Sequence, residues 1–261
     1  NKDPNMIKKI IKKLINLTNF RLVHKNDWYE RQVNLIPEIN KNDLNFIKNL
    51  EKYSMCPPAA HWSIIQSINY ISKKKIPGDF VECGVFKGGN LILMNHIRNR
   101  LNLNNKIFAF DTFEGMSEPT IYDKDLKDVP ADKTFEIYKQ SGEKWCYGGL
   151  EEVKKNISLF DKNYAQNFNF IKGKVEETLK INNNLPKTIS LLRLDTDFYE
   201  STKIEMEILF PRLVKGGILI IDDYGHWKGS QKAVDEYLDL KNNFHFLHRV
   251  DYGTRLLIKD Y

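Results

Sequence analysis

The sequence has few cysteines, and their spacing does not suit a metal site or a disulfide framework. Its three cysteines, Cys56, Cys83 and Cys146, lie far apart, and none forms a C-x-x-C pair. Neither a disulfide-stapled fold nor a structural zinc site is therefore indicated. Cys83 lies inside the apolar stretch Phe80-Val-Glu-Cys, so we interpret it as a small buried residue.

Long apolar runs and nucleotide-triphosphate motifs are also missing. No run reaches the length of a membrane span and no signal-peptide pattern opens the chain, so we expect a cytoplasmic protein without stable membrane insertion. The absence of the Walker motif G-x-x-x-x-G-K-[ST] disfavours a nucleoside triphosphate as ligand. With 261 residues, of which 41% are apolar, the chain can bury a full α/β core.

The net charge of +6 resides at the amino-terminal end. Residues 1–25 carry seven basic residues and one acidic residue, which leaves 33 of the 40 basic and 33 of the 34 acidic residues for the rest. This neutral remainder argues against a nucleic-acid partner, which would need a basic stripe on the core. Apolar residues recur at helical spacing in the basic segment, at Met6, Ile7, Ile10, Ile11, Leu14 and Leu17. We expect this stripe to pack against a second subunit of a homodimer, with membrane-surface attachment as the alternative.

The apolar pattern predicts a doubly wound α/β fold. Strands are expected at 79–83, 106–111, 168–172, 189–195 and 217–222, and their alternation with helical segments is typical of a mostly parallel sheet. Two further runs, 244–250 and 254–259, flank a Gly-containing turn and predict an antiparallel carboxyl-terminal hairpin. Residues 1–75 are expected to form a helical cap, with a helix over 58–71, and residues 76–261 the domain that contains the sheet.

Three acidic residues end two of the expected strands. Asp195 closes the run that starts at Ile189, and Asp222 with Asp223 closes the run that starts at Gly217. Because parallel strands end at one edge of a sheet, these carboxylates would converge there and repel one another unless a cation lies among them. Oxygen ligands favour a hard ion such as Mg²⁺. The alternative is that Asp195 caps a helix and that the Asp-Asp pair begins a turn.

A glycine-containing turn upstream favours the metal interpretation. The first strand ends near Glu82, and a turn with Gly84 and Gly88 precedes a helix that begins near Asn90. The second strand ends in Asp111, where this architecture places an acceptor for ribose hydroxyls. The spacing E-x-G-x-x-x-G is looser than the dinucleotide fingerprint. The combination of turn, ribose acid and metal acids nevertheless indicates an adenosine cofactor beside a metal-bound substrate.

At these motifs the chain resembles the macrocin O-methyltransferase (TylF/MycF) family of S-adenosylmethionine-dependent enzymes. The resemblance extends from Tyr53-Ser-Met55 to Ala233-Val-Asp-Glu236 and includes Leu194-Asp-Thr-Asp-Phe-Tyr199 and Asp222-Asp-Tyr-Gly-His226. It implies a class I methyltransferase-like fold in which residues 76–261 bind the cofactor and catalyse the reaction. It also implies Mg²⁺ bound by Asp195, Asp222 and Asp223.

For the cofactor, the resemblance implies that Glu82 and Gly84 hold the methionyl end of S-adenosyl-L-methionine and that Asp111 holds its ribose. The full set of expected cofactor contacts is Met55, Glu82, Gly84, Val85, Lys87, Gly88, Asp111, Thr112, Phe113, Gly173, Val175 and Asp195. The family has an arginine where this chain has Lys87. A lysine can still meet a carboxylate, although without the bidentate fork.

The implied reaction is methyl transfer to a hydroxyl, for which we expect a sugar of a glycosylated metabolite or surface polysaccharide. Mg²⁺ would lower the pKa of that hydroxyl, and Asp195 or His226 would accept its proton. Catechol methyltransferases place a lysine three residues after the first metal acid, but here that residue is Phe198. Asp197 is expected to cap the next helix. The alternative functions are methylation of a phenolic small molecule and a non-catalytic, methyltransferase-like scaffold.

The stretch from Glu114 to about Leu150 interrupts the alternating pattern and is rich in aromatic residues. A long insertion after the expected ribose-binding strand is usually functional or mobile. We expect residues 114–150 to form a lid over the acceptor, with Trp145, Tyr147 and Tyr224 as candidate acceptor contacts. The alternative is a helical insertion whose aromatic rings serve to pack it down.

Overall fold

The computed structural model describes residues 36–240 and 245–261, and residues 41–261 form one compact unit. The predictions for the basic amino-terminal stripe, its packing on a second subunit and its alternative use at a membrane lie outside the described residues. Within the described part, no helix combines the length and apolar character needed to cross a membrane. The division of the chain at residue 75 stays a prediction.

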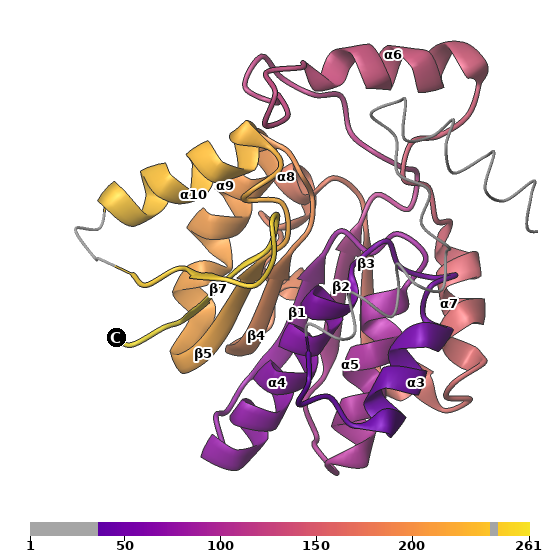
Figure 1. Cartoon of the computed structure of the whole chain (residues 1–261), viewed down its shortest axis with the longest axis vertical. Helices are drawn as coiled ribbons and strands as arrows, with labels where there is room; N and C mark the ends of the chain where they lie inside the picture. Colours follow the sequence, from indigo (N-terminus) through magenta and orange to yellow (C-terminus); the bar gives the residue numbers. More distant parts are fainter. Residues whose placement is uncertain (1–35, 241–244) are drawn as a thin grey trace, which may run out of the picture. The chain divides into compact units, whose positions relative to one another are not determined.

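A seven-stranded sheet forms the centre of the compact unit, in the order β3-β2-β1-β4-β5-β7-β6 (Figure 1). Strands β1 to β5 are parallel, and β7 and β6 are antiparallel at one edge. The strands are β1 Asp79–Cys83, β2 Ile107–Asp111, β3 Phe168–Lys172, β4 Ile189–Leu194, β5 Leu213–Ile221, β6 His248–Arg249 and β7 Arg255–Ile258. The predicted doubly wound sheet with an antiparallel carboxyl-terminal hairpin is confirmed.

Helices cover both faces of the sheet. Helices α4 and α5 lie on one face, while α8, α9 and α10 pack on the other around a core of apolar strand residues. The helices are α3 Lys41–Asn49, α4 Pro58–Lys74, α5 Gly89–Arg100, α6 Ala131–Ser141, α7 Leu150–Ser158, α8 Val175–Thr178, α9 Tyr199–Ile208 and α10 Lys228–Leu240, with short 3-10 turns at Tyr164–Asn167, Asn182–Asn184 and Phe210–Arg212. The helix expected over 58–71 is confirmed and continues to Lys74.

Two expected strands differ from the observed ones by four residues at one end, whereas the expected strands 106–111, 189–195 and 254–259 differ by a single residue at one or both ends. The expected strand 217–222 begins earlier, at Leu213, because the chain already pairs with β4 there. Of the expected strand 244–250, only His248 and Arg249 are paired in the described residues, since β7 itself has just four residues.

Strand register brings the ends of β1, β4 and β5 to one level. Cys83 is the partner of Leu194, and Leu194 is the partner of Ile221. The next residues continue this ladder, because the Asp195 amide donates to the Cys83 carbonyl (2.8 Å) and the Asp222 amide to the Leu194 carbonyl (2.9 Å). The acids that follow β4 and β5 are therefore neighbours at the carboxyl edge of the sheet, where α/β folds bind ligands.

Side-chain alternation along the strands turns two charged residues toward α4 and α5. Val81 and Cys83 of β1, like their neighbours on β4, belong to the core under α8, α9 and α10. Because successive strand residues face opposite sides, Glu82 and its register partner Arg193 lie on the other face. Both side chains are completely buried.

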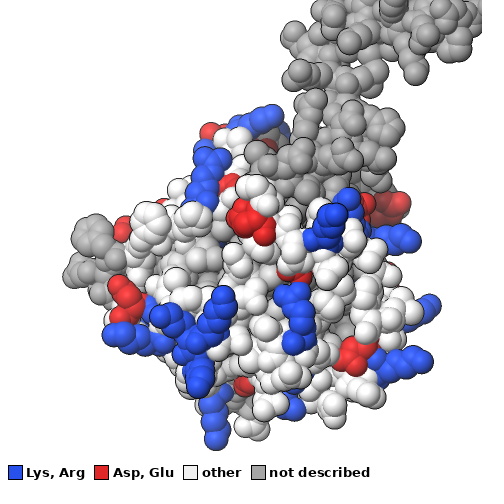
Figure 2. Space-filling model, turned by 60° about the horizontal axis from the view of Figure 1, so that its bottom comes forward, with Lys and Arg blue, Asp and Glu red and all other residues white. Residues whose placement is uncertain are grey.

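Charged residues on the surface are mixed in sign. Figure 2 shows lysine and arginine side chains standing singly or in small groups across one face, with acidic side chains among them. On this face of the described chain there is no continuous basic stripe of the kind that a nucleic-acid partner would require.

The turn after β1 depends on a glycine, which yields a stability prediction. Gly84 has φ +82°, and a Cβ atom there would lie 1.8 Å from the Asp195 carbonyl oxygen. We expect Gly84→Ala to lower the free energy of unfolding by at least about 2 kcal/mol, because the left-handed conformation alone costs an L-residue about 1–2 kcal/mol and the contact adds to it. Urea unfolding would measure this loss.

Gly142 offers a matched control. It has φ +74°, but a Cβ atom there would meet nothing within 4 Å. Gly142→Ala should therefore show only the conformational cost. Equal losses for the two variants would contradict the idea that the β1 turn is held against Asp195.

Candidate functional site

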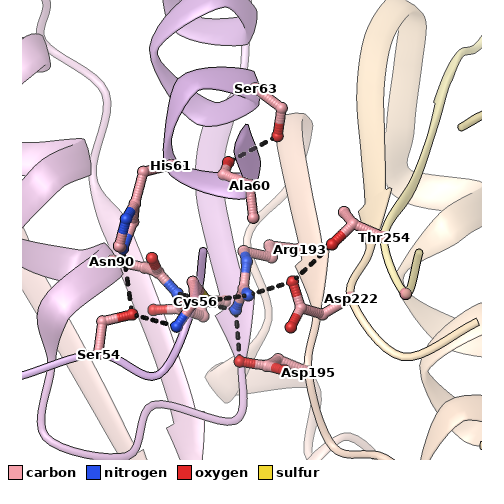
Figure 3. A network of polar contacts seen from close by, with 12 residues as sticks. Ser54, Cys56, Ala60, His61, Ser63, Asn90, Arg193, Asp195, Asp222 and Thr254 are labelled. Carbon is pink, nitrogen blue, oxygen red and sulfur yellow. Dashed lines mark hydrogen bonds and ion pairs between the residues drawn. The ribbon is translucent and has the colours of Figure 1, made fainter. Parts of the chain in front are cut away.

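A buried arginine joins carboxylates from three adjacent strands. Arg193 Nη1 donates to Glu82 Oε1 of β1 (2.9 Å) and to Asp195 Oδ2 (2.6 Å), and its Nη2 lies 2.7 Å from Asp222 Oδ1 (Figure 3). The Arg193 side chain is 0% exposed. Its guanidinium therefore supplies the positive charge that keeps these strand-end acids together.

Arg193 corrects one sequence-based expectation. The strand-end acids were expected to converge without a cation of the chain's own, so that a bound metal would have to balance all of them. The signal for Arg193 was a single charged residue inside the apolar run 189–194, two residues before Asp195 and hence on the same side of the strand. Sequence reasoning missed it because a strand residue alone does not reveal its partners on other strands.

The loop before α4 closes over the guanidinium. Cys56 Sγ lies 3.0 Å from Arg193 Nη2 and also accepts a hydrogen bond from Asn90 Nδ2 (3.4 Å). Ser54 Oγ accepts the Cys56 amide (3.1 Å) and lies 3.1 Å from His61 Nε2 (Figure 3). Burial, with Arg193 nearby, lowers the pKa of His61 to about 4, and burial raises the pKa of the Cys56 thiol. Both groups are thus neutral at pH 7.

Two buried oxygens beside Arg193 have no hydrogen-bond partner among the described residues. These are Glu82 Oε2 and Asn90 Oδ1. Burial raises the pKa of Glu82 to about 7, and the neighbouring Arg193 opposes this rise. An unsatisfied buried acceptor costs stability, so both oxygens are suited to receive N–H donors from a ligand. They fit the amino group at the methionyl end of S-adenosylmethionine, the end that the family resemblance implies for Glu82.

A second group of acids lies next to the Arg193 network. The group consists of Asp195, Asp197 and Asp223. Each contributes one carboxylate oxygen, and these three oxygens lie within 4.8 Å of one another. Asp223 Oδ2 is buried and has no hydrogen-bond partner within residues 36–240 and 245–261. Burial first, and then neighbouring negative charge, raise the pKa of Asp197 to about 7 and that of Asp223 well above its usual range. Carboxylates crowded in this way fit a divalent cation with oxygen ligands.

The position of Arg193 separates two possible metal-binding groups. Cys56, Asp195 and Asp222 also lie within 4.8 Å of one another, but the guanidinium already contacts all three. Asp222 Oδ1 accepts in addition from Thr254 Oγ1 (3.2 Å). Both of these contacts use Oδ1 of Asp222. Of the three expected ligands, Asp195 and Asp223 therefore lie together with Asp197, whereas Asp222 is grouped with Asp195 and Cys56 around Arg193.

Asp197 does not have the role expected from the sequence. Helix α9 begins after Phe198 without a side-chain cap from its own segment, so the expectation that Asp197 caps it is wrong. Asp197 instead adopts φ +68°, and its Oδ2 accepts from Trp227 Nε1 (3.1 Å). This conformation turns its carboxylate toward Asp195 and Asp223.

The expected ribose acid is held by backbone amides. Asp111 Oδ2 accepts from the Val85 amide and Oδ1 from the Phe113 amide, each at 2.6 Å. Thr112 Oγ1 donates to the Gly115 carbonyl (2.7 Å), which closes the turn after β2. These contacts bring the turns after β1 and β2 together around Asp111.

The other expected cofactor residues surround these turns, and their roles stay predictions. Gly173 donates its amide to the Asp111 carbonyl (2.9 Å), and Val175 is buried at the start of α8. Gly88, in the left-handed conformation, precedes α5. Lys87 lies 4.0 Å from Glu152, and Met55 is 66% exposed.

The base of the insertion packs beside the second group of acids. The Trp145 ring meets Phe198 (6.0 Å between centroids) and Trp227 (6.1 Å) edge to face, and it stacks on Tyr138 (6.1 Å). Phe198 follows Asp197 in the sequence, and Trp227 donates a hydrogen bond to the Asp197 carboxylate. The aromatic residues of the insertion therefore do pack it down, at a position next to the expected acceptor site.

The remaining candidates differ in their surroundings. His226 Nδ1 lies 3.2 Å from the Tyr252 hydroxyl, so Tyr252 orients the ring, and His226 stays a candidate base. Tyr147 is 41% exposed, with Lys144 over its ring. The Tyr224 hydroxyl donates to Asp235 Oδ1 (2.7 Å). The acceptor roles of both tyrosines stay predictions.

The Arg193 network predicts a strong effect on stability. We expect Arg193→Met to lower the free energy of unfolding by about 3–5 kcal/mol, because it leaves buried carboxylates without their cation. Arg193→Lys should lose less, since it keeps the charge without the planar fork. Lys154→Met, which removes an exposed pair with Glu151, is the control. Equal unfolding curves for Arg193→Met and Lys154→Met would refute the role of Arg193.

Comparison with known proteins places this geometry in a family. Residues 48–256 match the model of the macrocin-O-methyltransferase (TylF) family. The chain is 30% identical over 177 residues to demethyldecarbamoylnovobiocin O-methyltransferase of Streptomyces niveus, covering 67% of this chain and 63% of that protein. It is 34% identical over 164 residues to 8-demethyl-8-(2,3-dimethoxy-alpha-L-rhamnosyl)-tetracenomycin-C 4'-O-methyltransferase of Streptomyces olivaceus, covering 62% of this chain and 58% of that protein. The matches thus span less than two thirds of either relative.

Solved structures agree with the fold. The O-methyltransferase NovP superposes with a TM-score of 0.70 at 25% identity, covering 80% of this chain and 83% of that chain. The calicheamicin methyltransferase CalS11 superposes with a TM-score of 0.63 at 21% identity, covering 92% and 95%, which supports the fold alone. Since the family model spans most of the sequence, from residue 48 to residue 256, the chain belongs to the macrocin O-methyltransferase (TylF) family.

Proposed function

We propose that the protein is a Mg²⁺-dependent O-methyltransferase that transfers a methyl group from S-adenosyl-L-methionine to a sugar hydroxyl of a glycosylated metabolite or surface polysaccharide. The observation that supports this most is the side-by-side arrangement of two complementary sites. Unpaired acceptors at Glu82 and Asn90 suit the amino end of the cofactor, and the acids Asp195, Asp197 and Asp223 suit a divalent cation. Asp195 belongs to both, since it contacts Arg193 on one side and the acids on the other.

The chain's own residues have distinct tasks in this reaction. Glu82 and Asn90 orient the amino end of the methyl donor, and Asp111 accepts from its ribose. Asp195, Asp223 and Asp222 or Asp197 hold Mg²⁺, which when bound lowers the pKa of an acceptor hydroxyl. Asp195 is the first candidate to take the hydroxyl proton and His226 the second. Fixing both reactants in the crevice removes much of the entropic cost of their encounter.

The sugar as acceptor is supported by a relative and by the aromatic base of the insertion. The name of the Streptomyces olivaceus relative specifies a rhamnosyl group and transfer to a 4' oxygen. In this chain the partly buried Trp145 packs on the buried rings of Phe198 and Trp227 next to Asp197, and the exposed part of the Trp145 ring is suited to bury the C–H face of a sugar. Phe198 stands where catechol methyltransferases have a lysine, which favours a sugar over a phenol.

An acceptor panel tests the proposal. The full chain would be incubated with Mg²⁺, S-adenosylmethionine labelled in its methyl group, a series of unmethylated rhamnosides and a catechol. We expect label on a rhamnoside hydroxyl and none on the catechol. Label on the catechol alone would favour the phenolic alternative. Cofactor binding with no transfer to any acceptor would favour the scaffold.

The acid group predicts a strict metal requirement. Excess EDTA should abolish turnover, and Asp195→Asn or Asp223→Asn should lower Mg²⁺ affinity by at least about 100-fold, because groups that merely orient a metal ligand are already worth 10–100-fold. Titration calorimetry with Mg²⁺ gives these affinities. Asp132→Asn, at an exposed acid of α6, is the control. Comparing Asp222→Asn with Asp197→Asn identifies the third ligand, and full activity in EDTA would exclude the metal.

Asp111 separates cofactor binding from metal binding. We expect Asp111→Ala to weaken S-adenosylmethionine binding by about 1.5–3 kcal/mol, the range for hydrogen bonds to a charged group, with unchanged Mg²⁺ affinity. Asp111→Asn keeps an acceptor oxygen for the Val85 or Phe113 amide and controls for collapse of the turn. Calorimetry would be done on the wild type, Asp111→Ala and Asp111→Asn. Equal cofactor affinity in all three would mean that Asp111 only holds the turn and does not bind the cofactor.

A further inference from the structure

A fully buried acid in the insertion contacts the start of a helix on the sheet. Asp123 is 0% exposed. Its Oδ2 accepts from the Thr120 amide (2.6 Å) and the Thr120 hydroxyl (2.8 Å), while its Oδ1 accepts from the Tyr199 amide (2.7 Å). One oxygen thus binds the insertion and the other binds the first turn of α9.

Asp123 therefore caps α9 from outside its own segment. Helix starts leave backbone amides without partners, and a side-chain oxygen of the preceding residue usually accepts one of them. Phe198 precedes α9 and cannot do so. Asp123 accepts this amide instead, from a loop that lies 76 residues before Tyr199 in the sequence.

The helix start that Asp123 holds is continuous with the loop that presents the acids. The chain passes from Asp195 through Asp197 and Phe198 directly into α9. Asp197 has a positive φ, a conformation that persists for a non-glycine residue only where the surroundings impose it. Trp227 holds the Asp197 carboxylate, and Asp123 holds the amide two residues later. Together they fix the loop from both sides.

Further contacts attach the same part of the insertion to the start of α10. The Lys228 amide donates to the Lys124 carbonyl (2.9 Å), and Asp125 forms a β-bridge with Trp227. A Cβ atom at Gly229 would lie 2.0 Å from Asp123 Oδ1, so the glycine leaves the space that this carboxylate occupies. The insertion, the loop with Asp197 and the chain after Asp223 thus meet at Asp123.

We propose that Asp123 is a positioning residue that couples the insertion to the metal site. It does not contact the cation, but it holds the 195–199 loop so that Asp197 faces Asp195 and Asp223. Whatever orders the insertion, including an acceptor, then also strengthens cation binding, and the coupling acts equally in the reverse direction. This inference rests on the proposed function, because it assigns the acid group to a cation.

The test compares three variants in Mn²⁺ titration of the full chain by calorimetry. Asp123→Ala removes the contacts to Thr120 and to Tyr199. Gly229→Ala keeps the aspartate but pushes its carboxylate out of the space next to residue 229. Thr120→Ala removes only a contact inside the insertion and is the matched control. We expect the first two to bind Mn²⁺ about 10-fold more weakly, the scale of orienting groups around metal sites, and Thr120→Ala to bind like the wild type. In Asp123→Ala and Gly229→Ala, S-adenosylmethionine affinity should fall less than Mn²⁺ affinity, since Asp195 is the one expected cofactor contact that lies in the 195–199 loop.

Amide hydrogen exchange supplies a second readout that does not need the metal. Loss of the cap should speed exchange at Tyr199 in Asp123→Ala and Gly229→Ala but not in Thr120→Ala. Unchanged Mn²⁺ affinity in both variants, with a wild type that binds Mn²⁺, would overturn the coupling and leave the proposed function standing. A wild type that binds no Mn²⁺ would overturn the proposed metal site. Exchange at Tyr199 that is equal in all four proteins would show that Asp123 does not position the loop.

Discussion

The organisation of the catalytic edge depends on one buried guanidinium. Arg193 meets Glu82, Asp195 and Asp222, which come from or directly follow β1, β4 and β5. Burying a charge is costly unless it is paired and hydrogen-bonded, and here the pairing runs across three neighbouring strands. The network can form only when these strands are in register, so it ties the geometry of the site to correct assembly of the sheet.

The same interaction divides the acids by function. The carboxylates that touch Arg193 share its single positive charge, so the protein balances their negative charge in part. Asp197 and Asp223 instead crowd against Asp195, and Oδ2 of Asp223 is buried without a hydrogen-bond partner in the described part of the chain. Repulsion within this second group is unfavourable without a cation, and that excess negative charge is what would bind one. Asp195 connects the two groups, since it contacts Arg193 on one side and lies with Asp197 and Asp223 on the other.

The insertion is a structural part of the candidate site. Trp145 packs on Phe198 and Trp227, and Asp123 occupies the start of α9. Both contacts converge on the loop that presents Asp197. An α/β sheet alone supplies acids at strand ends, but the conformation of the loop after β4 is imposed by a segment inserted after β2. Changes in the insertion would thus be felt at the loop that presents Asp197.

The sequence alone determined the sheet and the location of its functional edge. Apolar runs alternating with helical segments were sufficient to predict a mostly parallel α/β sheet. Asp195, Asp222 and Asp223 could be assigned to one edge because parallel strands end together. Expected boundaries failed mainly where pairing partners set the length, as at Leu213 and in the short hairpin. These features follow from periodicity and chain direction, which are local properties of a sequence.

Only the tertiary structure decided how the acids are used. Arg193 was visible as a lone charge in an apolar strand, but its three partners lie on other strands or beyond its own. Asp197 was expected to be a cap, and the actual cap, Asp123, is 76 residues away from the amide it accepts. Hydrogen bonds and charge pairs of this kind depend on distances between segments that the fold brings together. The sequence therefore determined which groups reach the edge of the sheet. Long-range contacts decided which of these acids pair with Arg193 and which crowd together without it, where they would suit a ligand.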